Sequence, residues 1–117
     1  MSEKIKELSP VVERYSIDVS IHIERPVLIV KEWTIYQAEE YFIRQRDHAE
    51  KFQRKVELDK ARALLKYAST CNAFLKEVRN VENDKKLIFS FGFYSLDSML
   101  YFKDTMSQMV DSATMKN

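Results

Sequence analysis

Residues 35–80 read IYQAEEYFIRQRDHAEKFQRKVELDKARALLKYASTCNAFLKEVRN and contain neither glycine nor proline. As one continuous α-helix, this segment would extend about 69 Å at 1.5 Å per residue. A compact domain of this size has a radius of gyration of only about 13 Å. A helix of that length cannot be buried in its own domain, so it either reaches a partner or folds back on itself.

The start of this helix is marked by a capping motif. Thr34 is followed three residues later by Gln37, the spacing at which each side chain bonds the other residue's free backbone N–H group. The sequence therefore predicts a helix over residues 34–80. The polar residues 80–86 follow it as a turn.

The apolar residues of this helix form two stripes on a helical wheel. The first stripe consists of Ala38, Tyr41, Phe42, Ala49, Phe52 and Val56, and the second of Ala61, Leu64, Leu65, Ala68, Cys71, Leu75 and Val78. A wheel at roughly 100° per residue separates the two stripes by roughly 120°. Because a coiled coil drifts by only ~20° per heptad, a simple long zipper is disfavoured.

Two interpretations of the offset stripes remain. The helix can break near Leu58-Asp59, with Asp59 as the cap of a second helix that packs antiparallel on the first. Alternatively, one unbroken helix packs its second half on its own sheet and presents its first half to another subunit. We favour the unbroken helix slightly, because neither glycine nor proline marks a break.

The segment before the helix has the pattern of β-structure. Apolar and polar residues alternate from Tyr15 to Glu24, as in a strand with one buried face. Arg25-Pro26 interrupts the alternation, because proline cannot donate to a β-ladder. We expect a β-hairpin over residues 15–33, with Val27 to Trp33 as its second strand. One bent strand is the lesser alternative.

The segment after the helix predicts one more strand and one more helix. Phe89, Phe91 and Phe93 alternate with smaller or polar residues over 87–94, where Gly92 suggests a bulge or a close backbone approach. Ser95 can cap an amphipathic helix over 95–115. With residues 1–14 as a lead-in, we expect a single α+β domain over residues 1–117. Its elements would follow the order ββ-α-β-α, and its three strands would form one mostly antiparallel sheet.

Composition restricts the function only loosely. The 117 residues include 19 basic and 18 acidic side chains, so the net charge favours no particular partner. The single cysteine, Cys71, cannot form an intrachain disulfide, which fits a reducing compartment. The first residues lack the apolar core of a signal peptide, and no apolar run is long enough to span a membrane. We therefore expect a small soluble cytoplasmic protein without a membrane partner.

The excess length of the helix favours a non-enzymatic interaction or assembly protein. It would oligomerise, most simply with a second copy of itself, or dock a protein partner. The candidate partner-binding residues are the aromatic side chains of the first half of the helix. They are Tyr36, Tyr41, Phe42 and Phe52.

The alternative function is nucleic-acid binding. Five basic residues at spacings of 7, 4, 7 and 4 would form a ridge along a continuous helix, and such a ridge can follow phosphates without reading bases. They are Arg44, Lys51, Lys55, Arg62 and Lys66. A solvated helix face, with pairs such as Glu40 and Arg44 at i,i+4, explains the same pattern.

The sequence carries no catalytic motif, and we expect neither a metal nor another cofactor. With Gly92 as its only glycine, the chain cannot form a P-loop or a dinucleotide fingerprint. Its two histidines and one cysteine are not at metal-ligand spacing. A small enzyme would require a cleft that gathers His22 or His48 with carboxylates from other elements.

Overall fold

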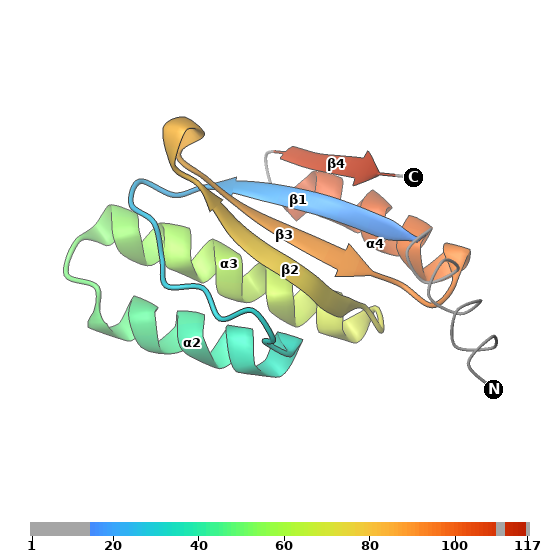
Figure 1. Cartoon of the computed structure of the whole chain (residues 1–117), viewed down its shortest axis with the longest axis horizontal. Coiled ribbons are helices and arrows are strands. Elements are labelled where there is room, and N and C mark those ends of the chain that lie inside the picture. The colour runs from blue at the N-terminus through green and yellow to red at the C-terminus, as the bar shows by residue number, and fades with distance from the viewer. Residues whose placement is uncertain (1–14, 110–111, 117) are drawn as a thin grey trace.

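The computed structural model describes residues 15–109 and 112–116. Its elements, in chain order, are β1 (Ser16–His22), α2 (Ile35–His48), α3 (Phe52–Thr70), β2 (Phe74–Val81), the 3₁₀ turn η1 (Glu82–Asp84), β3 (Lys86–Gly92), α4 (Leu96–Met109) and β4 (Ser112–Lys116). The α+β class is confirmed. The predicted order ββ-α-β-α is wrong, because two helices follow β1 and two strands then follow the helices (Figure 1).

The strands form one antiparallel sheet in the order β2-β3-β1-β4. Phe89 of β3 lies opposite Val19 of β1 on one side and Val78 of β2 on the other. Consecutive strands β2 and β3 are neighbours, whereas helices connect β1 to β2 and β3 to β4. This is the connectivity of a split β-α-β arrangement.

The helices pack on the sheet face that carries the aromatic side chains of β3. Phe89 and Phe91 are fully buried and share that face, because side chains alternate along a strand. Phe89 contacts the ring of Phe42 in α2 at 5.8 Å, and Phe91 contacts Phe102 in α4 at 5.4 Å. The buried face that the alternation predicted for the first strand is confirmed, because Ile17, Val19 and Ile21 are buried.

The unbroken helix favoured over 34–80 is wrong, whereas the alternative, a break with a second helix packed back on the first, is confirmed in kind. Helix α2 ends at His48, the backbone is extended at Ala49 and Lys51, and α3 begins at Phe52. The two helices are joined by this short turn and lie side by side (Figure 1). The fold-back occurs without glycine or proline, before the predicted break at Leu58-Asp59, and it lets each helix bury apolar residues against the other.

The end of the predicted long helix is a strand. Helix α3 stops at Thr70, and Asn72 adopts a left-handed backbone conformation with φ 60°. Asparagine tolerates this conformation better than most residues do. Residues 74–81 then pair with β3 as β2. Leu75 and Val78 have the spacing of an apolar helical face, but hydrogen bonds to β3 hold them in a strand instead.

The second strand of the predicted hairpin over 15–33 is also wrong. Residues 27–33 form an irregular connection between β1 and α2. The side chain of Asn80 bonds this connection, since its Oδ1 accepts from the Val27 N–H at 3.1 Å and its Nδ2 donates to the Val27 carbonyl at 2.8 Å. The side-chain amide thus occupies the backbone groups that a strand partner would have used.

At the C-terminal end, the predicted helix over 95–115 is too long. Helix α4 ends at Met109, and Ser112–Lys116 pairs with β1 as β4. The predicted lead-in of residues 1–14 lies outside the described residues.

Two local predictions are confirmed. Thr34 and Gln37 form both hydrogen bonds of a capping box at the start of α2. Gly92 is a place of close approach, because a Cβ atom there would lie 2.3 Å from Cζ of Phe74.

Candidate functional site

A cleft of about 820 Å³ lies between the β1–α2 connection and the turn that joins α2 to α3. Most of its lining is polar or charged. It is lined by Glu24, Arg25, Pro26, Gln45, His48, Ala49, Glu50, Lys51, Gln53, Arg54, Glu57 and Leu58. The turn after α2 creates this cleft, so the continuous helix expected from the sequence could not have revealed it.

Glu57 is the buried carboxylate of this cleft, with a side chain only 6% exposed. Its Oε1 accepts a hydrogen bond from the backbone N–H of Glu24 at 3.3 Å. Its Oε2 accepts from Nε2 of Gln53, one turn earlier in α3, at 3.4 Å. A buried carboxylate requires such donors, and these bonds attach the end of β1 to α3.

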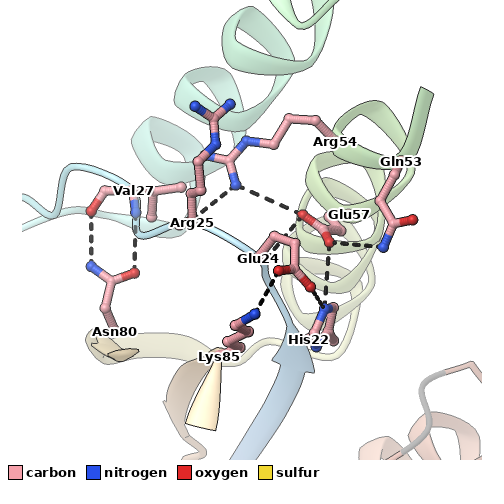
Figure 2. A network of polar contacts seen from close by, with 9 residues as sticks. All are labelled: His22, Glu24, Arg25, Val27, Gln53, Arg54, Glu57, Asn80 and Lys85. Atoms are coloured by element: carbon pink, nitrogen blue, oxygen red, sulfur yellow. Dashed lines mark hydrogen bonds and ion pairs between the residues drawn. The ribbon is translucent and has the colours of Figure 1, made fainter. Parts of the chain in front are cut away.

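Two cationic or potentially cationic groups also face Glu57 (Figure 2). Nη1 of Arg54 lies 3.7 Å from Oε1 and donates to the carbonyl of Arg25 at 2.9 Å. Nε2 of His22 lies 3.7 Å from Oε2. The two oxygens of Glu57 therefore face different partners, Arg54 on one side and His22 on the other.

The two carboxylate oxygens of Glu24 also face different partners. Its Oε2 lies 2.9 Å from Nε2 of His22, and its Oε1 accepts from Nζ of Lys85 at 2.8 Å (Figure 2). The hydrogen bond from Lys85, followed by that from His22, lowers the pKa of Glu24 below its ordinary value. The same contact with Glu24 raises the pKa of Lys85.

The fold positions these groups through backbone contacts. His22 is the last residue of β1. The next residue, Ile23, is buried and donates its N–H to the carbonyl of Lys85 at 3.0 Å. Lys85 itself has a left-handed backbone, φ 53°, in the turn between β2 and β3. The strand end and the β2–β3 turn thus bring His22, Glu24 and Lys85 together beside α3.

Chemically, the site places one imidazole nitrogen and two carboxylates in mutual reach. Such a set can share a proton or coordinate a cation. The cleft also meets the condition that the sequence left open, because its lining includes a histidine, His48, together with Glu24 and Glu57 from other elements. His22 does not line the cleft but lies beside both carboxylates. His48 lines the same cleft from the end of α2.

The four predicted partner-binding residues are not brought together as one surface. Phe42 is fully buried between α2 and the sheet, and Tyr41 is half-buried with its hydroxyl accepting from the Leu28 N–H at 3.1 Å. Tyr36 and Phe52 are exposed, by 68% and 81%. They begin α2 and α3, so that the length of α2, about 21 Å for its 14 residues, separates them.

The predicted basic ridge is divided between two helices and the turn. Arg44 lies on α2, Lys51 lies in the turn, and Lys55, Arg62 and Lys66 lie on α3. Two of the five are engaged within the chain: Nζ of Lys55 donates to the carbonyl of Arg46 at 3.2 Å, and Arg62 pairs with Asp59 at 3.1 Å. These contacts weaken the support for a phosphate-tracking ridge.

The sequence prediction did not single out Glu57 or Glu24. One signal was present, because Glu57 lies four residues before Ala61 and seven before Leu64, both buried. A carboxylate in line with an apolar helical stripe must be buried with partners. His22 and Glu24 also occupy alternate positions at a strand end, which places them on one side.

Comparisons with known proteins add no family to this description. Neither the protein-family models, nor the curated proteins, nor the solved structures contain a match to this chain. Among the described residues, no helix has the length and apolar character needed to cross a membrane.

Proposed function

We propose that this chain is a non-enzymatic interaction protein that self-associates through the α2–α3 hairpin. The observation that carries the proposal is Phe52, the first residue of α3, whose side chain is 81% exposed. Burying a phenylalanine side chain contributes about 1.5–3 kcal/mol, so its exposure at a helix start favours a partner. The length of a continuous helix no longer supports the proposal, because the helix folds back.

A second exposed apolar residue, four positions after Phe52, lies in a groove lined by charged side chains. Val56 lies one helical turn further along α3 and is also exposed. It lines a groove of about 340 Å³ together with Arg46, Asp47, Lys55, Asp59 and Lys60. An apolar centre within a polar rim is the usual anatomy of a protein interface.

A second copy of this chain is the occupant that the charges favour. The rim of the groove carries both signs, with Arg46, Lys55 and Lys60 against Asp47 and Asp59. In a twofold dimer the same patch meets itself. Because Arg46 pairs with Asp47 and Asp59 within the chain, the rim carries charges of both signs that are largely balanced and do not repel their copy. A patch of one sign would repel its copy.

Sedimentation equilibrium over a range of concentrations tests this proposal. We expect the wild-type mass to exceed the monomer mass at high concentration, and Phe52→Ser to abolish the excess. Tyr101→Ser is the matched control, because Tyr101 is an aromatic residue on α4 that is 64% exposed. A monomeric wild type, or equal association of Phe52→Ser and wild type, would refute the proposal.

A further inference from the structure

We propose that His22, Glu24 and Glu57 form a binding site for a divalent transition-metal ion, with Zn²⁺ as the representative ion. One potential ligand atom from each of the three residues lies within 4.8 Å of the others. The residues come from the end of β1, the connection after it and helix α3. This site is separate from the proposed interface at Phe52.

The distances suit a common metal ion after small side-chain adjustments. Nε2 of His22 lies 2.9 Å from Oε2 of Glu24 and 3.7 Å from Oε2 of Glu57. With Zn–N and Zn–O bonds of about 2.0–2.2 Å, neighbouring ligand atoms of a tetrahedral site are about 3.3–3.6 Å apart. Both observed distances lie close to this separation. Glu24 is exposed, so its side chain can shift by a few tenths of an ångström without repacking the core.

The outer oxygen of each carboxylate is held by a separate cationic group. Lys85 bonds Oε1 of Glu24, and Arg54 lies beside Oε1 of Glu57. The Glu24 N–H also donates to Oε1 of Glu57. Partners of this kind orient metal ligands, and here they leave both Oε2 atoms directed at His22. Gln53 is the exception, because its Nε2 donates to Oε2 of Glu57 and must turn away when an ion binds.

The ligand set and its charge favour a transition metal over calcium or magnesium. Lys85 and Arg54 already balance the two carboxylates, so a cation gains little from charge alone. Calcium and magnesium prefer oxygen ligands only, whereas imidazole nitrogen suits zinc and its neighbours in the transition series. Selectivity should therefore depend on His22.

The site is accessible to an ion from solvent. The His22 side chain is 53% exposed, and both Glu24 and Glu57 line the cleft between the β1–α2 connection and the α2–α3 turn. An ion can therefore enter from the cleft and complete its coordination with water. Binding should weaken on acidification, because a metal-bound imidazole must be deprotonated.

Isothermal titration calorimetry of the full chain with ZnCl₂ tests the proposal. We expect His22→Ala to weaken Zn²⁺ binding by at least about tenfold. Loss of a residue that only orients a metal ligand already weakens binding by about this factor, and His22 would bind the ion directly. His48→Ala is the matched control, because His48 is the chain's other histidine and, although it lines the cleft, is not one of the three residues whose ligand atoms lie within 4.8 Å of one another. His22 is exposed, so His22→Ala should fold, and circular dichroism checks this. CaCl₂ should bind more weakly than ZnCl₂.

A second readout identifies the ligand directly. In the His48→Ala protein, only one imidazole remains, and ¹H–¹⁵N correlation spectra should show a shift of the His22 Nε2 resonance on addition of Zn²⁺. Three results would overturn the site: no binding to wild type, equal binding by His22→Ala and wild type, or an unshifted His22 imidazole at saturating zinc.

Discussion

Nη1 of Arg46, near the end of α2, lies 2.7 Å from Oδ1 of Asp59 in the second turn of α3. Arg62 approaches the same oxygen at 3.1 Å. Asp59, which the sequence suggested as a helix cap, is therefore the point where charges from both helices meet. The hydrogen bond with Arg46 lowers the pKa of Asp59, and the contact with Arg62 adds to this effect.

Asp59→Asn should destabilise the hairpin in a pH-dependent way. A carboxylate with a lowered folded-state pKa contributes stability above its unfolded pKa of about 3.9, and this contribution is lost as the pH falls through the folded pKa. Because the pair is partly exposed, we expect a loss of about 0.2–1 kcal/mol at pH 7. Urea unfolding at pH 7 and at low pH measures it. Equal differences from wild type at both pH values would contradict this account, and Asp84→Asn, exposed in η1, is the control.

Phe42→Ala and Phe52→Ala should differ strongly in their effect on the free energy of unfolding. Phe42 is fully buried and contacts the rings of Trp33, Tyr41 and Phe89, so its truncation should cost about 3–5 kcal/mol. Phe52→Ala removes an exposed ring and should change the unfolding free energy by less than about 0.5 kcal/mol. Denaturant unfolding at low protein concentration measures both. Similar costs for the two variants would show that Phe52 is packed in the monomer.

Thr34→Ala should shorten or weaken α2. The Thr34 Oγ1 accepts from the Gln37 N–H at 3.1 Å, and Gln37 Oε1 accepts from the Thr34 N–H at 3.0 Å. Loss of an N-cap threonine costs about 0.5–2 kcal/mol. Thermal unfolding measures the loss, and Thr34→Ser, which keeps the hydroxyl, should restore most of it. Failure of serine to do so would assign the effect to the methyl group.

Tyr67→Phe should reduce the alkaline sensitivity of the protein. The Tyr67 hydroxyl is buried and its ring stacks on Phe102 at 5.8 Å. Burial raises the pKa of Tyr67 to about 12. A raised folded-state pKa contributes stability that is complete below the unfolded pKa, about 10, and is lost as the pH rises through the folded value. Unfolding free energies from pH 9 to 12 should fall less steeply for Tyr67→Phe. Parallel curves would contradict the assignment.

The sequence predicted those elements whose signals are local. The alternation around Ile17 and Val19 marks β1, the Thr34–Gln37 pair marks the start of α2, and Phe89 and Phe91 mark the core face of β3. Each signal depends on neighbouring residues within a few positions. These elements could therefore be predicted without knowledge of the contacts made by distant parts of the chain.

The failures have tertiary causes. The break at Ala49 and Lys51 has no glycine, no proline and no side-chain cap on α3, so packing between the helices rather than local preference determines it. β2 exists because β3 supplies its hydrogen bonds, and its β-bulge between Leu75 and Glu77 falls where the helical pattern continued. Long-range pairing of this kind leaves no periodic trace in one sequence.

The candidate site was unpredictable for the same reason. His22 and Glu57 are 35 positions apart in the chain and meet only once α3 has folded back beneath the end of β1. The sequence indicates that Glu57 is buried, because it lies in an apolar stripe, but it does not indicate which residues bond it.

The pairing of Asn80 with both backbone groups of Val27 has a consequence for the motions of the β1–α2 connection. Ile23 and Leu28 also donate their N–H groups, to the Lys85 carbonyl and the Tyr41 hydroxyl. The connection is thus bonded to β2, to the β2–β3 turn and to α2. Its opening requires that these elements separate, so the amide protons of Val27 and Leu28 should exchange with deuterium as slowly as those of regular structure.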